Sequence, residues 1–190
     1  MHHFNRREDR LFAENVDVTA LAEHIGTPFY CYSTATLRQH YTRLKDAFAQ
    51  NEVTICYSVK ANSNLGVIAT LADLGSGADV VSEGELRRAL LSGIPAEKIV
   101  FSGVGKTEAE MTYALNADIA QFNVESRAEL EQLSEVATKQ GKTARISLRV
   151  NPDIDAGTHE KISTGKAENK FGIAWDEAEA SYACLLYTSP

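Results

Sequence analysis

Lys60 closes an alternating stretch of the chain, at a place where an amine can do chemistry. The stretch begins at Val53. Successive side chains of a strand point to opposite faces, so the apolar members share one face and Lys60 shares the other with small polar side chains. In a barrel of parallel strands that second face is the interior, and its last residue opens onto the catalytic mouth. An amine there, partly withdrawn from water, could attack an aldehyde. The competing interpretation is a solvated lysine at a strand end.

Further polar side chains fall at the same end of other predicted strands. The strands are predicted at residues 53–59, 78–82, 98–102, 118–124 and 144–150. Asp79, Ser102, Asn123 and Arg149 share the inward phase of alternation. Because the carboxyl ends of parallel strands meet at one mouth, we expect these side chains to converge near Lys60. For some of them, a solvated strand end is the alternative.

The elements that must position these residues repeat along the chain. Neighbouring strands start 20 to 26 residues apart, which is one strand and one helix per interval. Three intervening helices begin with a capping-box pattern, a hydroxyl residue followed three positions later by Glu. The pairs are Ser82 with Glu85, Thr107 with Glu110, and Ser126 with Glu129. The longest helix, at about 126–140, carries an apolar stripe of Leu130, Leu133, Val136 and Ala137. Glycines such as Gly93 and Gly141 mark the helix ends.

Repeated strand–helix units imply parallel strands, in an open sheet or in a closed barrel. Central strands of an open sheet are apolar on both faces, because helices cover both. Several strands here have one polar face, as where Ser147 and Arg149 alternate with Leu148 and Val150. We therefore predict an α/β fold, a (β/α)₈ TIM-type barrel. A closed barrel of this class has eight strands, so the prediction is a barrel truncated after about five strands.

The first fifty residues have a different character. Residues 29–32 read as a short strand, after a turn at residues 26–28. Leu37, Tyr41, Leu44 and Phe48 then mark an amphipathic helix, which either caps the N-terminal side of the barrel or forms its last outer helix. Residues 151–172 are predicted to be a long loop at the mouth, where barrels keep functional residues.

Composition narrows the class of protein. A chain of 190 residues suits one domain, or one domain and part of another. A net charge of −7 argues against a nucleic-acid-binding surface. Cys31, Cys56 and Cys184 include no CxxC pair, which is typical of a reduced, cytoplasmic protein. The histidines have no metal-ligand spacing, no apolar run is long enough to span a membrane, and the N-terminus has no signal-peptide pattern. We therefore expect no metal, nucleic-acid or membrane partner.

The motif around Lys60 resembles the lysine motif of the fold-type III, pyridoxal-phosphate-dependent decarboxylases. The motif spans Tyr57 to Asn62, and further matches follow in order at 77–85 and 148–152. Residues 157–173 look most like the diaminopimelate decarboxylase subgroup, more than the ornithine or arginine members. The resemblance covers about residues 10 to 183.

This resemblance implies a barrel of the alanine racemase-like class, followed by a C-terminal β domain, in a homodimer. It implies pyridoxal 5'-phosphate (PLP) as cofactor and the conversion of meso-2,6-diaminopimelate into L-lysine and carbon dioxide. Lys60 corresponds to the lysine that bonds to the cofactor aldehyde. Asp79 and Arg149 match positions near the cofactor, and Glu85 matches a supporting one. A loop that folds over the substrate supplies His159, Ser163, Thr164 and Gly165.

Two roles stay open beside those implied: a structural ion pair for Arg149 and a helix cap for Asp79. The family pattern also has a later histidine, a glycine-rich phosphate loop and a C-terminal domain that this chain lacks. We divide the chain into a lead-in at 1–34, a partial PLP-binding barrel at 35–183, and an artefactual tail at 184–190 where the helical pattern breaks. The chain alone is therefore expected to be inactive.

Three other functions compete with this interpretation. The first is another fold-type III enzyme, such as an ornithine, arginine or carboxynorspermidine decarboxylase or a racemase. The second is a non-catalytic homologue that regulates a relative, although retention of Lys60 argues against it. The third is a phosphate-binding barrel of unrelated chemistry.

Overall fold

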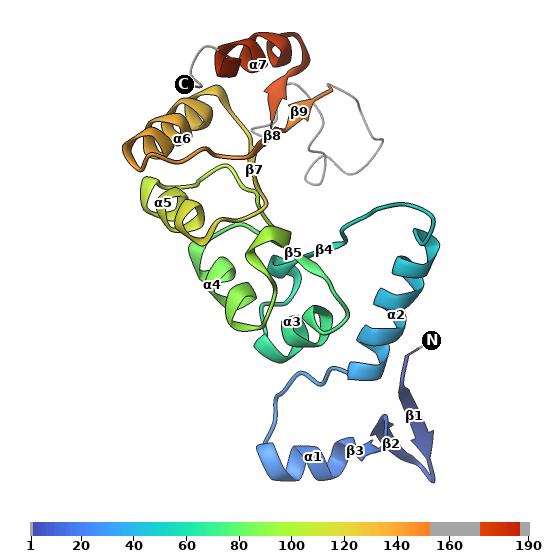
Figure 1. Ribbon diagram of the computed structural model, residues 1–190. Coiled ribbons are helices and arrows are strands. Elements are labelled where there is room, and N and C mark those ends of the chain that lie inside the picture. Colours follow the sequence, from blue (N-terminus) through green and yellow to red (C-terminus); the bar gives the residue numbers. More distant parts are fainter. Residues whose placement is uncertain (1, 153–171, 187–190) are drawn as a thin grey trace.

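A five-stranded parallel sheet forms the centre of the computed structural model, which describes residues 2–152 and 172–186 (Figure 1). Its strands are β4 (Cys56–Ser58), β5 (Gly77–Val80), β6 (Ile99–Phe101), β7 (Gln121–Val124) and β8 (Ile146–Leu148). Each strand pairs in parallel with the next one along the chain. All five predicted strands are confirmed, and each is shorter than its pattern suggested.

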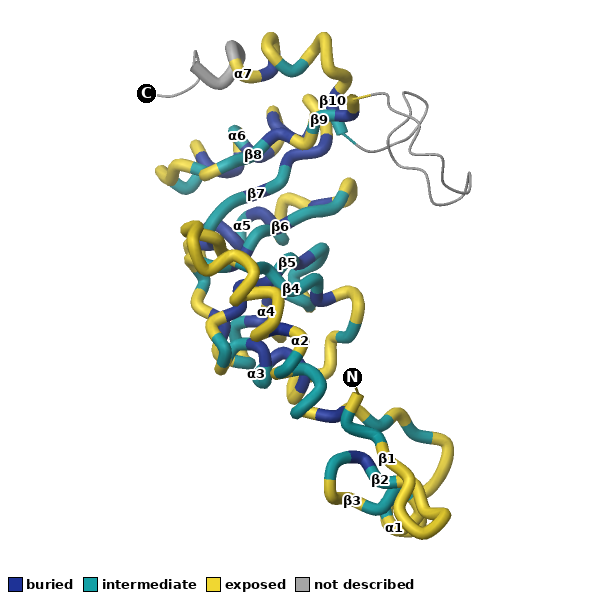
Figure 2. Tube along the Cα trace, turned by 90° about the vertical axis from the view of Figure 1, so that its right-hand side faces the viewer, coloured by how far each residue is buried: buried dark blue, intermediate teal, exposed yellow. Residues whose placement is uncertain are grey.

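Four helices lie along one side of this sheet (Figure 1). They are α3 (Leu65–Ala72), α4 (Glu83–Leu91), α5 (Glu108–Ala117) and α6 (Arg127–Lys139). Short 3₁₀ turns occupy Val59–Ala61 and Ala96–Lys98. The core lies between the two layers, where Val80, Phe101, Phe122 and Val124 are buried and the Phe101 and Phe122 rings stack with centroids 6.1 Å apart. Figure 2 shows the buried positions gathered where these strands and helices meet.

The strand order supports the predicted barrel class. Parallel strands in chain order, each followed by a helix on the same side, are the repeating unit of a (β/α)₈ barrel. The other face carries partly buried polar side chains, among them Asp79, Asn123 and Ser147. In the described part of the chain, β4 and β8 each pair with one strand only, so the sheet has the five strands expected of a partial barrel.

All three predicted helix starts are confirmed, because Ser82, Thr107 and Ser126 each accept a hydrogen bond from the backbone N–H three residues on. The reciprocal bond of a full capping box occurs at Thr107. At the other two helices, the glutamate reaches one residue further back. Glu85 Oε2 accepts from the Val81 N–H at 2.9 Å, and Glu129 Oε2 accepts from the Glu125 N–H at 3.2 Å. These glutamates therefore tie each helix to the end of the preceding strand.

Glu110 joins the starts of two helices. Its Oε2 accepts from the Thr107 N–H at 3.0 Å, and its Oε1 accepts from the Glu83 N–H at 3.1 Å. Burial raises the pKa of this carboxyl, but the hydrogen bonds from Thr107 and Glu83 outweigh it and hold the pKa below its usual value. The carboxylate therefore stabilises the fold above the pKa of the unfolded chain, and this contribution is lost as pH falls through the lower folded pKa.

The Glu110→Gln variant is accordingly expected to lose about 1 kcal/mol of stability at pH 7. The substitution removes the charge that strengthens the hydrogen bonds from Thr107 and Glu83, and the loss is modest because the site is partly exposed. The difference from the unsubstituted protein should begin to shrink below pH ~4, where the carboxyl of the unfolded chain becomes protonated, and should be lost as pH falls through the lower folded pKa. Urea unfolding at pH 7 and pH 3 measures both values. Glu131→Gln is the matched control, since Glu131 is exposed and pairs with Arg127 within one helix. An equal difference at both pH values would contradict the prediction.

The helix patterns read from the sequence are also confirmed. The stripe of α6 is buried along its length, at Leu130, Leu133, Val136 and Ala137. The amphipathic helix is α2 (Thr34–Ala47), which places Tyr41 against Val67 and Leu71 of α3. Helix α2 therefore packs beside α3, while two of the four residues of its predicted apolar stripe, Leu44 and Phe48, are exposed.

The N-terminal region differs from expectation. Strands β1 (Phe4–Arg7), β2 (Arg10–Ala13) and β3 (Val16–Asp17) form an antiparallel sheet that the sequence did not predict, and α1 (Val18–Ile25) follows it. The strand predicted at residues 29–32 is wrong, since this segment pairs with no strand in the described ranges and Tyr30 is 89% exposed. The small sheet is attached to α2, where the Ser33 hydroxyl donates to Glu14 at 2.8 Å.

Beyond the sheet, β9 (Val150–Asn151) pairs in parallel with β10 (Ile173–Ala174). A 3₁₀ turn at Trp175–Glu177 leads into α7 (Ala178–Leu186). The helix continues to Leu186, so the predicted break in the helical pattern at Cys184 is wrong. Within residues 2–152 and 172–186, no helix combines the length and apolar character needed to cross a membrane.

Candidate active site at the carboxyl ends of the strands

A chain of hydrogen bonds runs across three strands on the polar face of the sheet. Gln121 Nε2 donates to Asn123 Oδ1 at 2.8 Å, and Asn123 Nδ2 donates to the Ser102 hydroxyl at 2.9 Å. Ser102 Oγ then donates to Asp79 Oδ1 at 2.5 Å, a length typical of a bond to a carboxylate. Every donor points towards Asp79, so the bonds polarise one another and hold this carboxylate in one orientation. The predicted convergence of Asp79, Ser102 and Asn123 on one another is confirmed, and their closeness to Lys60 stays a prediction.

The helix-cap alternative for Asp79 is not what the structure shows, because Ser82 is the N-cap of α4. Instead Asp79 lies beside Ser58 of β4 in the parallel register, facing the same side as Cys56. Burial, and after it the nearby Asp79 carboxylate, raises the pKa of the Cys56 thiol. Cys56 therefore stays a neutral thiol near pH 7 and is a poor nucleophile.

Lys60 follows the carboxyl end of β4 and so lies at the predicted mouth, but not on the strand. The strand ends at Ser58, and Lys60 is the middle residue of the 3₁₀ turn Val59–Ala61. Strand β4 pairs with β5 over three residues only, so the predicted strand does not extend back to Val53 or forward to Lys60. Val53 is accordingly 49% exposed. Lys60 is exposed, and the expected partial withdrawal from water is not supplied by the described residues.

A polar pocket opens beside the hydrogen-bonded chain, with a volume of about 320 Å³. Its lining residues are Ser102, Asn123, Glu125, Ser147, Leu148 and Arg149. Arg149 Nη1 donates to Glu125 Oε2 at 2.9 Å, so the predicted ion-pair alternative for Arg149 is observed. The Arg149 side chain is still 42% exposed and lines the pocket. The guanidinium therefore combines a structural partner with access to a ligand.

Three further charged residues, Lys106, Glu125 and Glu129, lie at this end of the sheet, and the sequence patterns identified only the helix-start role of Glu129 and not the ion pairs. Lys106 Nζ donates to Glu129 Oε1 at 2.6 Å, to the Gly103 carbonyl at 2.7 Å and to the Asn123 carbonyl at 2.8 Å. The Lys106 and Glu129 side chains are 1% and 7% exposed. Glu125 is also buried. A usable signal was present, since Lys106 and Glu125 are charges placed just after predicted strands.

The remaining predicted site residues have separate outcomes. Glu85 is half-buried and accepts a hydrogen bond from the Val81 N–H, which is a structural role at the start of α4. The predicted substrate-loop residues His159, Ser163, Thr164 and Gly165 lie outside the described residues. Among the residues described, the mouth therefore presents one exposed amine, one oriented carboxylate and one accessible guanidinium.

Comparisons with known proteins agree with this arrangement. Residues 34–187 match the family model described as pyridoxal-dependent decarboxylase, pyridoxal binding domain. The diaminopimelate decarboxylase of Vibrio cholerae is 55% identical over 183 residues, which cover 96% of this chain and 44% of that protein. The diaminopimelate decarboxylase of Aquifex aeolicus is 48% identical over 176 residues, covering 93% of this chain and 41% of that protein.

Solved structures give the same relationship. The diaminopimelate decarboxylase of Helicobacter pylori in complex with L-lysine is 45% identical, with a TM-score of 0.87 over 90% of this chain and 44% of that one. The enzyme of M. jannaschii in complex with L-lysine is 38% identical, with a TM-score of 0.90 over 100% of this chain and 46% of that one. The chain thus spans less than half the length of the relatives it matches.

Proposed function

Because the chain belongs to the family of pyridoxal-dependent decarboxylases, we propose that it forms part of an enzyme that converts meso-2,6-diaminopimelate into L-lysine and carbon dioxide. The observation that carries the proposal is the position of Lys60, directly after the carboxyl end of β4 at the mouth of a partial barrel. Functional groups of such barrels are supplied by the loops after the strands. The proposal covers residues 35–183 as the PLP-binding region.

The residues at the mouth fit a cofactor with an aldehyde and an anionic group. Lys60 would hold the aldehyde, because its amine is exposed and accessible. Bound PLP supplies a ring that takes up the electrons left when carbon dioxide departs. Asp79, oriented by Ser102, would place negative charge near the site. Arg149 would orient a phosphate or carboxylate through its planar set of donors.

The test uses an extended chain, in which residues 1–183 continue into the remainder of the Vibrio cholerae relative. With PLP present, the extended chain is expected to release carbon dioxide from meso-diaminopimelate and not from L-ornithine or L-arginine. The 190-residue chain alone is expected to release none, because it spans 44% of that relative. Carbon dioxide release and product analysis measure both results.

Each alternative function predicts a different result in the same assay. Turnover of ornithine or arginine in preference to meso-diaminopimelate would contradict the proposed substrate. Covalent binding of PLP without release of carbon dioxide from any of these amino acids would favour a non-catalytic homologue. Absence of PLP binding would favour unrelated chemistry, and turnover by the 190-residue chain would contradict the expected need for the remaining sequence.

A homodimeric, cytoplasmic enzyme also belongs to the proposal. The family resemblance of the lysine motif supports the dimer, and the absence of CxxC spacing among the cysteines supports a reducing compartment. Light scattering of the extended chain tests the dimer.

A further inference from the structure

Glu125 is a buried carboxylate anchored on several sides. It is 2% exposed. Its Oε1 accepts from the Gly103 N–H at 2.8 Å, and its Oε2 accepts from Arg149 Nη1 at 2.9 Å. Its own backbone N–H donates to Glu129 Oε2 at 3.2 Å. Buried charges are costly without partners, and here both carboxylate oxygens have one.

The anchors of Glu125 are themselves held in place. The Gly103 carbonyl accepts from Lys106 Nζ at 2.7 Å, so both backbone polar groups of Gly103 are engaged. Gly103 has a φ of +103°, a conformation that side-chain-bearing residues rarely adopt. The loop after β6 therefore presents its N–H to Glu125 in one orientation.

Arg149 is the exposed end of this assembly. Its side chain is 42% exposed while that of Glu125 is 2% exposed, so the pair reaches from the interior to the pocket. The pocket is also lined by neutral polar side chains, Ser102, Asn123 and Ser147. A guanidinium held by a buried carboxylate keeps its planar donor set in one orientation, which suits recognition of a carboxylate or phosphate.

From this geometry we infer that Glu125 is a positioning residue, which holds the Arg149 guanidinium over the mouth pocket to bind an anionic group of the substrate or cofactor. The inference rests on the proposed function, since the anion is the carboxylate of the amino acid or the phosphate of PLP. Glu125 also lines the pocket, but both of its carboxylate oxygens are engaged by Gly103 and Arg149, so its effect on the ligand passes through Arg149. If the ion pair only joined the segments that follow β7 and β8, the loss of Glu125 would not change ligand binding through Arg149.

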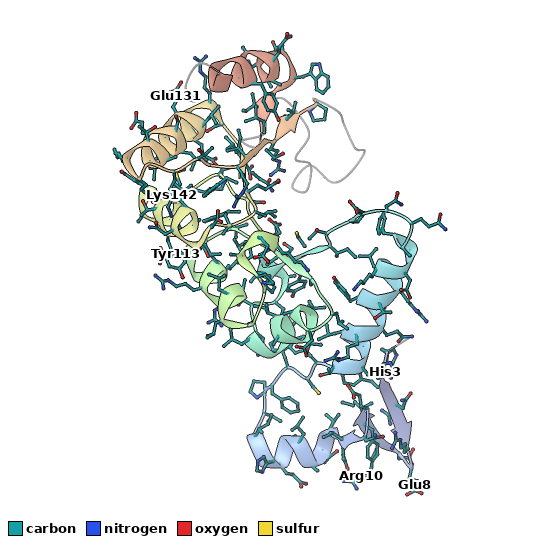
Figure 3. The ribbon with its side chains drawn as sticks, in the orientation of Figure 1. His3, Glu8, Arg10, Tyr113, Glu131 and Lys142 are labelled. Carbon is teal, nitrogen blue, oxygen red and sulfur yellow. The ribbon has the colours of Figure 1, made fainter. Side chains whose placement is uncertain are left out.

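A double-mutant cycle in the extended chain separates these roles. The variants are Glu125→Gln, Arg149→Gln and the two combined, and Glu131→Gln is the control because Glu131 lies on the outer side of α6 (Figure 3). Glu125→Gln alone is expected to weaken binding of the anionic ligand by about 10- to 100-fold, as a misplaced positioning group does. In the Arg149→Gln background, the same change should have an effect of less than about twofold. Urea unfolding of each variant checks the fold.

Two ligand measurements identify the anion. If Arg149 binds the phosphate, the dissociation constant of PLP rises in Glu125→Gln while that of pyridoxal, which has no phosphate, does not. If Arg149 binds the substrate carboxylate, KM for meso-diaminopimelate rises and the dissociation constant of PLP does not. Either result supports the inference.

Equal effects of Glu125→Gln with and without Arg149 would overturn the inference, as would an Arg149→Gln variant with unchanged binding constants. If Glu125→Gln does not fold, Glu125→Asp replaces it, since the shorter carboxylate keeps the charge and displaces the guanidinium. Failure of the proposed function is a different result, because the unsubstituted extended chain would then not bind PLP covalently.

Discussion

Replacement of Lys60 by alanine is expected to abolish covalent attachment of PLP to the extended chain and to lower its decarboxylase activity by more than about 1,000-fold. The loss follows because the aldehyde needs an accessible amine at the mouth, and Lys60 supplies one. Lys106, which lies at the same end of the sheet, cannot replace it. Its Nζ is buried and donates three hydrogen bonds, so an aldehyde cannot reach it.

Lys60→Arg tests whether the nucleophile or the charge matters. Arginine keeps the positive charge but is not a nucleophile at neutral pH, so the same loss is expected. Lys139→Ala is the matched control, because Lys139 is exposed on α6 and pairs with Glu108 on the outer surface. Borohydride reduction followed by peptide mass analysis locates the cofactor. Cofactor trapped on the protein in Lys60→Ala would show that another lysine carries the aldehyde.

Local patterns predicted the sheet and its helices because their determinants lie close together in sequence. Each N-cap hydroxyl bonds to a backbone N–H three residues away, as at Thr107 and Ser126. The polar face was also predictable, since alternation within a paired strand fixes which side chains meet. The strand lengths were not, because the pairing of β4 with β5 ends at Ser58 and Lys60 falls in the following turn.

The N-terminal sheet was missed because its turns lack the usual sequence signals. Tight hairpins need positive φ, which Asn-Gly or Asp-Gly normally provides. Here the turn between β1 and β2 places Glu8 and Asp9 at φ 49° and 64°, and Glu14 follows at φ 58°. The segment 29–32 shows the opposite error. Its aromatic composition suits a strand, but a strand also needs a partner, and the described residues provide none.

The pairing of Lys106 with Glu129 beneath the site escaped prediction for a further reason. Lys106 and Glu129 are 23 positions apart in sequence, and so are Asp79 and Ser102. This separation matches the length of one strand–helix unit. Such pairs form because parallel strands in chain order bring successive loops together. Once β6 and β7 are known to be neighbours, a lysine after the first and a glutamate after the second become candidate partners.

Replacement of Lys106 by methionine is expected to destabilise the extended chain by about 3–5 kcal/mol, the usual loss when one member of a buried ion pair is removed. The methionine side chain is one heavy atom shorter than that of lysine, so the cavity created is small. The Glu129 carboxylate, 7% exposed, loses its cation at 2.6 Å, and the Gly103 and Asn123 carbonyls lose a donor. The loss should appear in urea unfolding as a lower midpoint with an unchanged slope.

The double variant Lys106→Met/Glu129→Gln distinguishes the buried charge from the packing. Glutamine keeps an oxygen for the Glu125 N–H but carries no charge, so the double variant should be more stable than Lys106→Met alone. Lys139→Met is the exposed counterpart. Its partner Glu108 also lies 2.9 Å away, but both side chains are more than half exposed, so water screens the pair and the midpoint should not move. If Lys106→Met behaves like Lys139→Met, the buried pair does not hold the loops after β6 and β7. If Lys106→Met is destabilised and the added Glu129→Gln restores stability, the unpaired charge of Glu129 is the cause of the destabilisation.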